Sequence, residues 1–402
     1  MNQAKPGGFR GTSHGGLLVV GGPAVGSSRP GRLQRLRQSM AAAEVDAVLV
    51  SQPESRRYLS GYRATDLPPR DSAGYLLITE SGQFVLTDPR TEAQAAVEAP
   101  HFALRRYGGG VAARQALRDL VSEQRIKRIG FEAQHLPYAL WQDFNGALEG
   151  VATLLPTPGL IDGLRAVKDE DEIAALRASI ALDDQAFTHL ARNLHEGRRE
   201  QDLAWEVEEF IRTQGADGIA FDPITVSGPN AAVPHARPGE RPIQAGELVL
   251  IDMGARLDGY CSDMTRTVGL GSVPPRLKNI WQIVLEAQLE AEAKVRPGMI
   301  GSEVDAIARS VIQRSGYGDA FVHGLGHGIG LEVHEPPWIT QTKGDMVLEP
   351  GMVFTIEPGI YLPEDCGVRI EDIVLLTDQG AEVLPRSPKK LPLEEVLIDL
   401  DR

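Results

Sequence analysis

Cysteine is scarce in this 402-residue chain, which contains only Cys261 and Cys366. Two cysteines exclude a disulfide framework and fit a reducing compartment, so we expect a cytoplasmic protein. No apolar run approaches the length of a transmembrane helix. Blocks of basic residues are also missing, and the formal net charge is −14. We therefore expect neither nucleic acid nor a membrane as a partner.

The remaining composition is that of an ordinary globular protein, with 42% apolar and 24% charged residues. The chain is longer than one domain requires and can form two sizeable cores. Residues 1–31 are rich in glycine, and their short apolar core is interrupted by glycines. This pattern predicts a flexible tail rather than a signal peptide.

Between residues 32 and 158, helical and strand-like segments alternate, which predicts an α/β domain. The predicted helices are 32–43, 112–122 and 138–148, and the predicted strands are 47–50, 75–78, 83–86 and 128–131. A change of composition at 156–159 marks the predicted domain boundary. No residues in this part have catalytic spacing, and the pair Arg56-Arg57 is predicted to be solvated.

Residues 159–402 are predicted to form an α+β domain with a pair of helices before each of two hairpins. The predicted helices begin at the acidic run 168–172, at Glu200, at Leu277 and at Ser302. The acidic run suits the start of a helix, where the helix dipole stabilises negative charge. The order helix–helix–hairpin occurs twice, which indicates a duplicated unit around one central site.

The first hairpin is predicted in residues 248–268, where Asp258-Gly259 separates two strand-like runs. Asp-Gly is a preferred pair for a two-residue turn, because both residues must adopt positive φ. Such a turn places Asp252 opposite Thr265, so Asp252 and Asp263 become diagonal neighbours on one face. The two carboxylates could share a divalent cation or be solvated on an exposed face, and the hairpin alone leaves both interpretations open.

A second hairpin repeats this acidic pair. Residues 354–357 predict a strand, and residues 367–376, GVRIEDIVLL, predict its antiparallel mate. A loop centred near Glu364 places Glu357 roughly opposite Glu371. Four carboxylates gathered in one core would be strongly destabilising without a cation.

Histidines lie between the two hairpins, in a segment rich in glycine. His323, His327 and His334 fall within twelve residues, and the intervening glycines allow backbone and substrate to approach closely. Four carboxylates with one imidazole suit a pair of hard or borderline divalent ions, of which Mn²⁺ fits best and Co²⁺, Fe²⁺ and Zn²⁺ are alternatives. Two such ions can hold a hydroxide that attacks at neutral pH, so the predicted reaction class is metal-assisted hydrolysis.

The residues that carry these predictions resemble those of a known family. Their types and order match the pita-bread metallopeptidases, which include methionine aminopeptidase, aminopeptidase P and Xaa-Pro dipeptidase (prolidase); the matching residues are Asp252, Asp263, His327, Glu357 and Glu371. The preceding α/β domain resembles the creatinase/prolidase-type amino-terminal domain of the branch that contains prolidase and aminopeptidase P. His235, His323, His334 and Arg369 match further positions of that branch.

The resemblance implies a role for each of these residues. Two divalent ions per chain would be held by the five matching residues, with a hydroxide between them. Glu357 would also take a proton from the water that bridges the two ions, which forms the hydroxide, and would pass this proton to the leaving nitrogen. His235 and His334 would hold the scissile carbonyl and the developing oxyanion. His323 would line the proline-side pocket, and Arg369 would hydrogen-bond the carboxylates of the metal site.

The substrates implied are small peptides with proline after the first residue, and the enzyme is expected to be a homodimer. A dipeptidase needs a cation for the free carboxylate, and family dipeptidases can carry an arginine on the loop before the Glu357 strand. Here Lys343 is the only cation on that loop and is the candidate to bind the substrate carboxylate, although a lysine lacks the bidentate geometry of arginine. We predict a dipeptidase, with aminopeptidase P as the alternative. A third interpretation, a pita-bread binding module without metal, is disfavoured because none of the five matching residues is missing.

Overall fold

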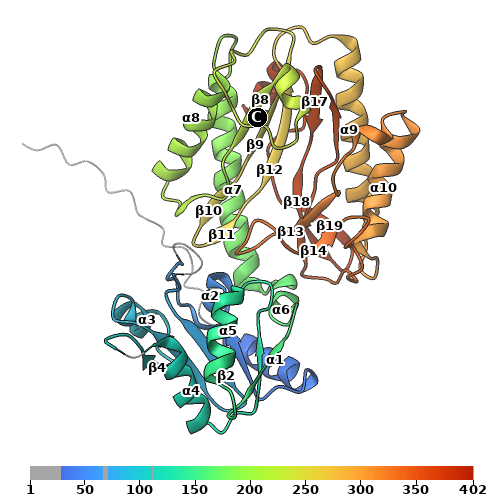
Figure 1. The fold of residues 1–402 in the computed structure, drawn as a ribbon. Helices are drawn as coiled ribbons and strands as arrows, with labels where there is room; N and C mark the ends of the chain where they lie inside the picture. Colours follow the sequence, from blue (N-terminus) through green and yellow to red (C-terminus); the bar gives the residue numbers. More distant parts are fainter. Residues whose placement is uncertain (1–28, 67–70, 111, 402) are drawn as a thin grey trace, which may run out of the picture.

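The computed structural model describes residues 29–66, 71–110 and 112–401, which form two lobes (Figure 1). Most of the predicted tail, residues 1–28, lies outside this described part. Arg29–Gly31 were predicted to belong to the tail, but they form the first turn of helix α1 (Arg29–Ala42). Proline is tolerated in a first helical turn, because its missing N–H would have no partner there, so Pro30 does not prevent the earlier start. Among the described residues, no helix is both long and apolar enough to cross a bilayer.

The amino-terminal lobe is built on a six-stranded mixed sheet with the order β4-β3-β2-β1-β5-β6. Its strands are β1 (Ala47–Val50), β2 (Tyr75–Thr79), β3 (Gln83–Thr87), β4 (Ala103–Arg106), β5 (Arg128–Phe131) and β6 (Thr153–Pro156). Its further helices are α2 (Pro53–Ser60), α3 (Glu92–Glu98), α4 (Ala113–Glu123) and α5 (Tyr138–Ala147), and α6 (Asp162–Ala166) connects this lobe to the second. The predicted α/β alternation is confirmed, while β4, β6 and the helices α2, α3 and α6 were not predicted.

Both faces of this sheet are covered. In β1, Val48 and Val50 belong to one apolar cluster, and Ala47 and Leu49 belong to another on the opposite face. A strand buried on both faces is expected to be continuously apolar, as β1 is.

The second lobe consists of two helix pairs, each followed by strands. Its helices are α7 (Glu170–Asn193), α8 (Glu200–Thr213), α9 (Pro275–Lys294), α10 (Gly301–Arg314) and α11 (Leu393–Leu400), with short 3₁₀ turns η1 (Gly228–Ala232) and η2 (Gly318–Ala320). The pair α7–α8 flanks the strands on one side in Figure 1, and the pair α9–α10 flanks them on the other. The acidic run was correctly predicted as a helix start, because Asp169 and Glu172 form a capping box at the beginning of α7.

Between the helix pairs lie several small antiparallel sheets. The first unit contributes β7 (Gly218–Ile219), β8 (Ile224–Ser227), β9 (Leu248–Met253), β10 (Ala255–Leu257), β11 (Tyr260–Cys261) and β12 (Met264–Gly269). The second contributes β13 (Gly326–Gly328), β14 (Glu335–Ile339), β15 (Val353–Ile356), β16 (Gly359–Leu362), β17 (Cys366–Arg369), β18 (Asp372–Thr377) and β19 (Gly380–Val383). The predicted duplication of an α+β unit is confirmed by this order.

Charged residues join the two lobes. Arg165 of α6 and the nearby Lys168 both pair with Glu335 of β14, the latter at 2.9 Å between Nζ and Oε1. At the tip of the first hairpin, Asp258 pairs with Arg57 of α2 at 3.0 Å. The prediction that Arg56 is solvated was wrong. Its side chain is fully buried, because Asp66 and several backbone carbonyls neutralise and bind the guanidinium.

Candidate metal centre

The first hairpin has the predicted turn and register. Asp258 and Gly259 have φ of 45° and 72°, so both central residues are in the left-handed region. Leu257 pairs with Tyr260, and Asp252 pairs with Thr265. The ladder therefore presents Asp252 and Asp263 on one face, as the sequence predicted.

The second hairpin also has the predicted register, since Ile356 pairs with Asp372 and Gly359 pairs with Arg369. Glu357 and Glu371 lie between these pairs and face each other. The predicted continuous strand 367–376 is interrupted at Glu371, which separates β17 from β18. The N–H of Glu371 donates instead to the carbonyl of Thr265 at 3.0 Å, and this bond joins the second hairpin to the first.

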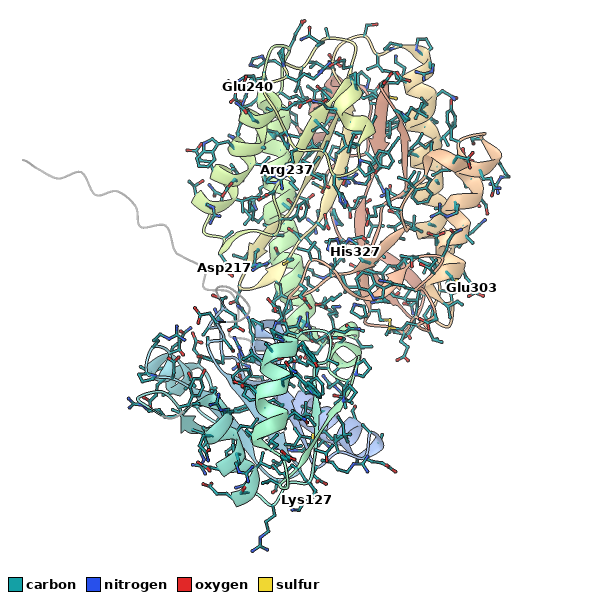
Figure 2. All side chains as sticks on the ribbon, viewed as in Figure 1. Lys127, Asp217, Arg237, Glu240, Glu303 and His327 are labelled. Atoms are coloured by element: carbon teal, nitrogen blue, oxygen red, sulfur yellow. The ribbon has the colours of Figure 1, made fainter. Side chains whose placement is uncertain are left out.

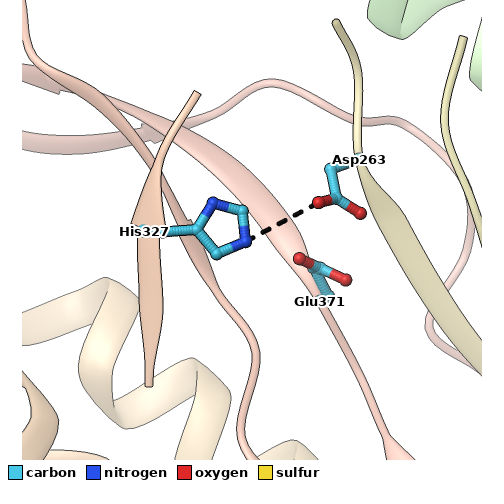
Figure 3. Close-up of side chains that lie close together, drawn as sticks. All are labelled: Asp263, His327 and Glu371. Carbon is cyan, nitrogen blue, oxygen red and sulfur yellow. Dashed lines mark ion pairs between the residues drawn. The ribbon is translucent and has the colours of Figure 1, made fainter. Parts of the chain in front are cut away.

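Three side chains, two from the hairpins and one from β13, converge. Donor atoms of Asp263, His327 and Glu371 lie within 4.8 Å of one another, and Figure 3 shows the three side chains pointing toward a common space. The Nε2 atom of His327 is 3.7 Å from Oδ2 of Asp263 and 3.3 Å from Oε1 of Glu357. Nδ1 of His327 lies 3.1 Å from the carbonyl of Gly328, to which it can donate. This contact leaves Nε2 free to offer its lone pair to a cation.

The electrostatics of the cluster favour a bound cation. Burial raises the pKa of Asp263 and of Glu371 well above the usual range, and the neighbouring carboxylates raise both further. Asp252 accepts a bond from Arg369 through Oδ2, while its buried Oδ1 has no hydrogen-bond partner among the described residues. An unsatisfied oxygen and mutually repelling carboxylates are both stabilised by a divalent ion, so the residues present fit such an ion.

Two threonines fix the ligand candidates. Thr265 donates to Oε2 of Glu371 at 2.6 Å, and Thr355 donates to Oε1 of Glu357 at 3.2 Å. Thr355 also accepts from the backbone N–H of His327 at 3.1 Å. Each threonine lies two residues from an acidic residue in the sequence, and this period-two spacing could have identified both.

A chain of hydrogen bonds leads from Asp252 to His323. The buried Arg369 contacts Asp252 and donates to the hydroxyl of Tyr361 at 2.8 Å. The same hydroxyl lies 2.9 Å from Nε2 of His323, whose Nδ1 lies 2.7 Å from the carbonyl of Gly324. Tyr361 was not predicted. It lies four residues after Glu357 on β16, so strand periodicity could have found it.

The cluster lies in a cavity of about 520 Å³, into which the predicted histidines also project. The cavity is lined by all five metal-ligand candidates and by His235, His323, His334 and Arg369. The ring of His334 lies 4.2 Å from that of His327, centroid to centroid. Burial and the neighbouring His327 lower the pKa of His334 to about 4, so its imidazole is neutral at pH 7 and keeps one N–H to donate.

Lys343 does not line this cavity. Its ammonium lies over the ring of Trp338, 5.8 Å from the centroid, and Trp338 is a lining residue. The lysine is exposed to solvent.

The family of the chain follows from comparison with known proteins. The family model described as metallopeptidase family M24 matches residues 174–378, just over half of the chain. The chain belongs to metallopeptidase family M24. A second model, the creatinase/prolidase N-terminal domain, matches residues 32–167. This membership agrees with the predicted pita-bread fold and implies the use of divalent metal.

Relatives within the family cover nearly the whole chain. It is 35% identical to the Xaa-Pro dipeptidase of Pyrococcus furiosus, over 90% of this chain and 99% of that protein. The structure of a Xaa-Pro dipeptidase from Bacillus anthracis superposes with a TM-score of 0.85 at 38% identity, covering 90% of this chain and 99% of the other. An X-Pro aminopeptidase from Thermotoga maritima superposes with a TM-score of 0.79 at 34% identity, covering 88% and 99%.

Proposed function

We propose that this M24 metallopeptidase hydrolyses the Xaa-Pro bond of dipeptides. The observation that carries the proposal is the convergence of four carboxylates and four histidines in one cavity. Relatives named Xaa-Pro dipeptidase, similar over almost their full length, support the substrate class. Removal of the first residue from longer Xaa-Pro peptides is the second candidate, because a similar structure is an X-Pro aminopeptidase.

Two divalent ions, with Mn²⁺ as the first choice, would be held by Asp252, Asp263, His327, Glu357 and Glu371. When bound, the ions would supply an acidified water as the nucleophile at neutral pH. Oxygen-rich donor sets with one imidazole suit Mn²⁺, while Co²⁺, Fe²⁺ and Zn²⁺ can bind the same set.

The remaining roles belong to the side chains of the cavity wall. Burial alone would raise the pKa of Glu357, but the neighbouring His327, His323 and Arg369 outweigh it and lower the pKa to about 2, so the side chain of Glu357 is ionised and can accept a proton. Glu357 would deliver that proton to the proline nitrogen as the bond breaks. His334 and His235 would donate to the carbonyl oxygen. His323 would face the proline ring, and Arg369 would fix the orientation of Asp252.

The proposed function is tested by comparing kcat/KM for a Xaa-Pro dipeptide with that for a Xaa-Pro-Xaa tripeptide, using Mn²⁺-loaded enzyme. We expect the dipeptide to be preferred by at least about tenfold, since a free carboxylate bound by a charged donor contributes about 1.5–3 kcal/mol. A preference for the tripeptide would establish the aminopeptidase alternative. Hydrolysis of neither would contradict both.

Metal binding is tested separately from activity by thermal unfolding. Mn²⁺ at 100 times its dissociation constant should stabilise the protein by about 2.7 kcal/mol. Asp263→Asn should raise the melting temperature of the metal-free protein, because it removes one of the repelling carboxylates, and should abolish the increase caused by Mn²⁺. Asp222→Asn, a cavity-wall residue outside the cluster, should respond to Mn²⁺ like the wild type. An undiminished response of Asp263→Asn would exclude Asp263 as a ligand.

Three further features complete the proposal. The chain would form a homodimer, as the family resemblance implies, and would be cytoplasmic, in keeping with two cysteines that are buried and free. The lobes would divide at residues 158/159, directly after β6, the last strand of the six-stranded sheet.

A further inference from the structure

The cavity contains two arginines, and only one of them is held by protein groups. Arg369 is 3% exposed and contacts Asp252, Thr265 and Tyr361. Arg237 lines the same cavity and is exposed to solvent. Within the described part of the chain, no hydrogen bond or ion pair of its guanidinium is found. A free guanidinium beside a substrate site is available for a ligand.

The backbone that carries Arg237 is anchored on both sides. Arg237 follows His235 by two residues, in a segment bounded by Pro234 and Pro238. The carbonyl of Pro234 accepts from Arg369 at 3.3 Å, and the N–H of Gly239 donates to Glu200 at 3.3 Å. Figure 2 places Arg237 in the same lobe as His327. The anchored segment holds the base of the Arg237 side chain fixed relative to the metal centre, so a ligand need order only the side chain itself.

No other arginine or lysine of the described cavity wall is free to bind the carboxylate of a dipeptide. Arg369 is already bound to Asp252, and the remaining charged residue of the wall outside the cluster is Asp222, which would repel a carboxylate. Lys343 lies outside the wall and over Trp338. A guanidinium, unlike an ammonium, can bind both oxygens of a carboxylate at once.

We propose that Arg237 binds the free carboxylate of the proline residue and thereby selects dipeptides. This inference rests on the proposed function and assigns its specificity to a segment other than the Lys343 loop. The carboxylate would lie on the same side of the cavity as His235, two residues before Arg237. Specificity would then come from the connection between η1 and β9, which also carries one of the carbonyl-binding histidines.

The test compares two substrates that differ only in that carboxylate: a Xaa-Pro dipeptide and its C-terminal amide. Arg237→Met keeps an unbranched, flexible side chain and removes the guanidinium charge. We expect it to lower kcat/KM for the dipeptide roughly 10- to 100-fold, mainly through KM, and to change that for the amide by less than about twofold. Arg237→Lys should fall between the wild type and Arg237→Met. Lys343→Met, the matched control, should leave both substrates within about twofold of the wild type.

Equal losses for the dipeptide and its amide in Arg237→Met would overturn the inference while leaving the proposed function intact. So would a wild type that cleaves both substrates equally well. The role of Arg237 can also be tested without turnover, by measuring calorimetrically how the dipeptide and its amide bind to Glu357→Gln protein with and without Arg237→Met. If removing Arg237 weakens binding of the dipeptide but not of its amide, the inference is supported even if the enzyme hydrolyses neither substrate. Unchanged binding of the dipeptide overturns the inference. Melting temperature and metal content of each variant confirm that the fold and the metal centre are preserved.

Discussion

Glu357→Gln is expected to lower kcat by about 10²–10⁴-fold, the usual contribution of a general acid–base group, while substrate binding changes little. Glutamine has the same shape as glutamate and can still accept from Thr355, which lies 3.2 Å from Oε1. It cannot take up the proton that hydrolysis releases. Stopped turnover with an intact dissociation constant for a Xaa-Pro dipeptide would identify Glu357 as the proton carrier.

Metal analysis must accompany this measurement, because Glu357 is also a ligand candidate. A variant that keeps the metal content of the wild type and loses turnover supports the proton-transfer role. A variant that loses one metal supports only the ligand role. The matched control is Glu240→Gln, an exposed position of the same lobe, which should retain full activity. Near-normal turnover of Glu357→Gln would remove Glu357 as the base.

Glu335→Gln is expected to reduce the free energy of unfolding by about 3–5 kcal/mol. The side chain of Glu335 is 3% exposed and pairs with Arg165 and Lys168, which are 2% and 0% exposed. Removing the carboxylate leaves two buried cations without their main partner. The resulting loss in the free energy of unfolding exceeds the loss caused by breaking a surface ion pair. Denaturant unfolding of the metal-free variant measures it directly. Glu382→Gln breaks the exposed pair with Arg177 and should cost at most about 1 kcal/mol.

The same carboxylate predicts a pH dependence of stability. Burial raises the pKa of Glu335, but Arg165 and Lys168 outweigh burial and lower it below the ordinary value. A depressed pKa stabilises the folded state above the unfolded pKa of about 4.3, and this stabilisation is lost as the pH falls through the folded pKa. The wild type should therefore lose more stability in acid than Glu335→Gln does. Parallel curves for the two proteins below about pH 4.3 would contradict this account.

The sequence predicted the local features that place the candidate site. The Asp258-Gly259 turn fixed the register of the first hairpin, and the Asp169 cap marked the start of α7, because both signals lie within a few residues of the structure they determine. The acidic pairs and the central histidines could be combined into one site because the strand period determines which residues share a face.

The sequence did not predict contacts between distant residues. Glu335 lies 170 residues from Arg165, and nothing in either neighbourhood indicates the partner. Arg56 is buried because carbonyls from several segments surround it, which composition alone cannot show. The strand 367–376 is interrupted because Glu371 bonds to Thr265 of the other hairpin. Lys343 was predicted as the carboxylate partner because it lies on the loop before the strand of Glu357. Arg237, the cavity arginine without a protein partner, lies more than a hundred residues earlier in the sequence.

The division of the metal centre between two hairpins has a consequence for the order in which the protein is made. Asp252 and Asp263 leave the ribosome about a hundred residues before Glu357 and Glu371. A nascent chain that ends between the two hairpins has at most three of the five ligand candidates and cannot form the cluster. Metal capture at the proposed site would thus be postponed until synthesis has passed Glu371, and a chain terminated before that residue would not retain the ions.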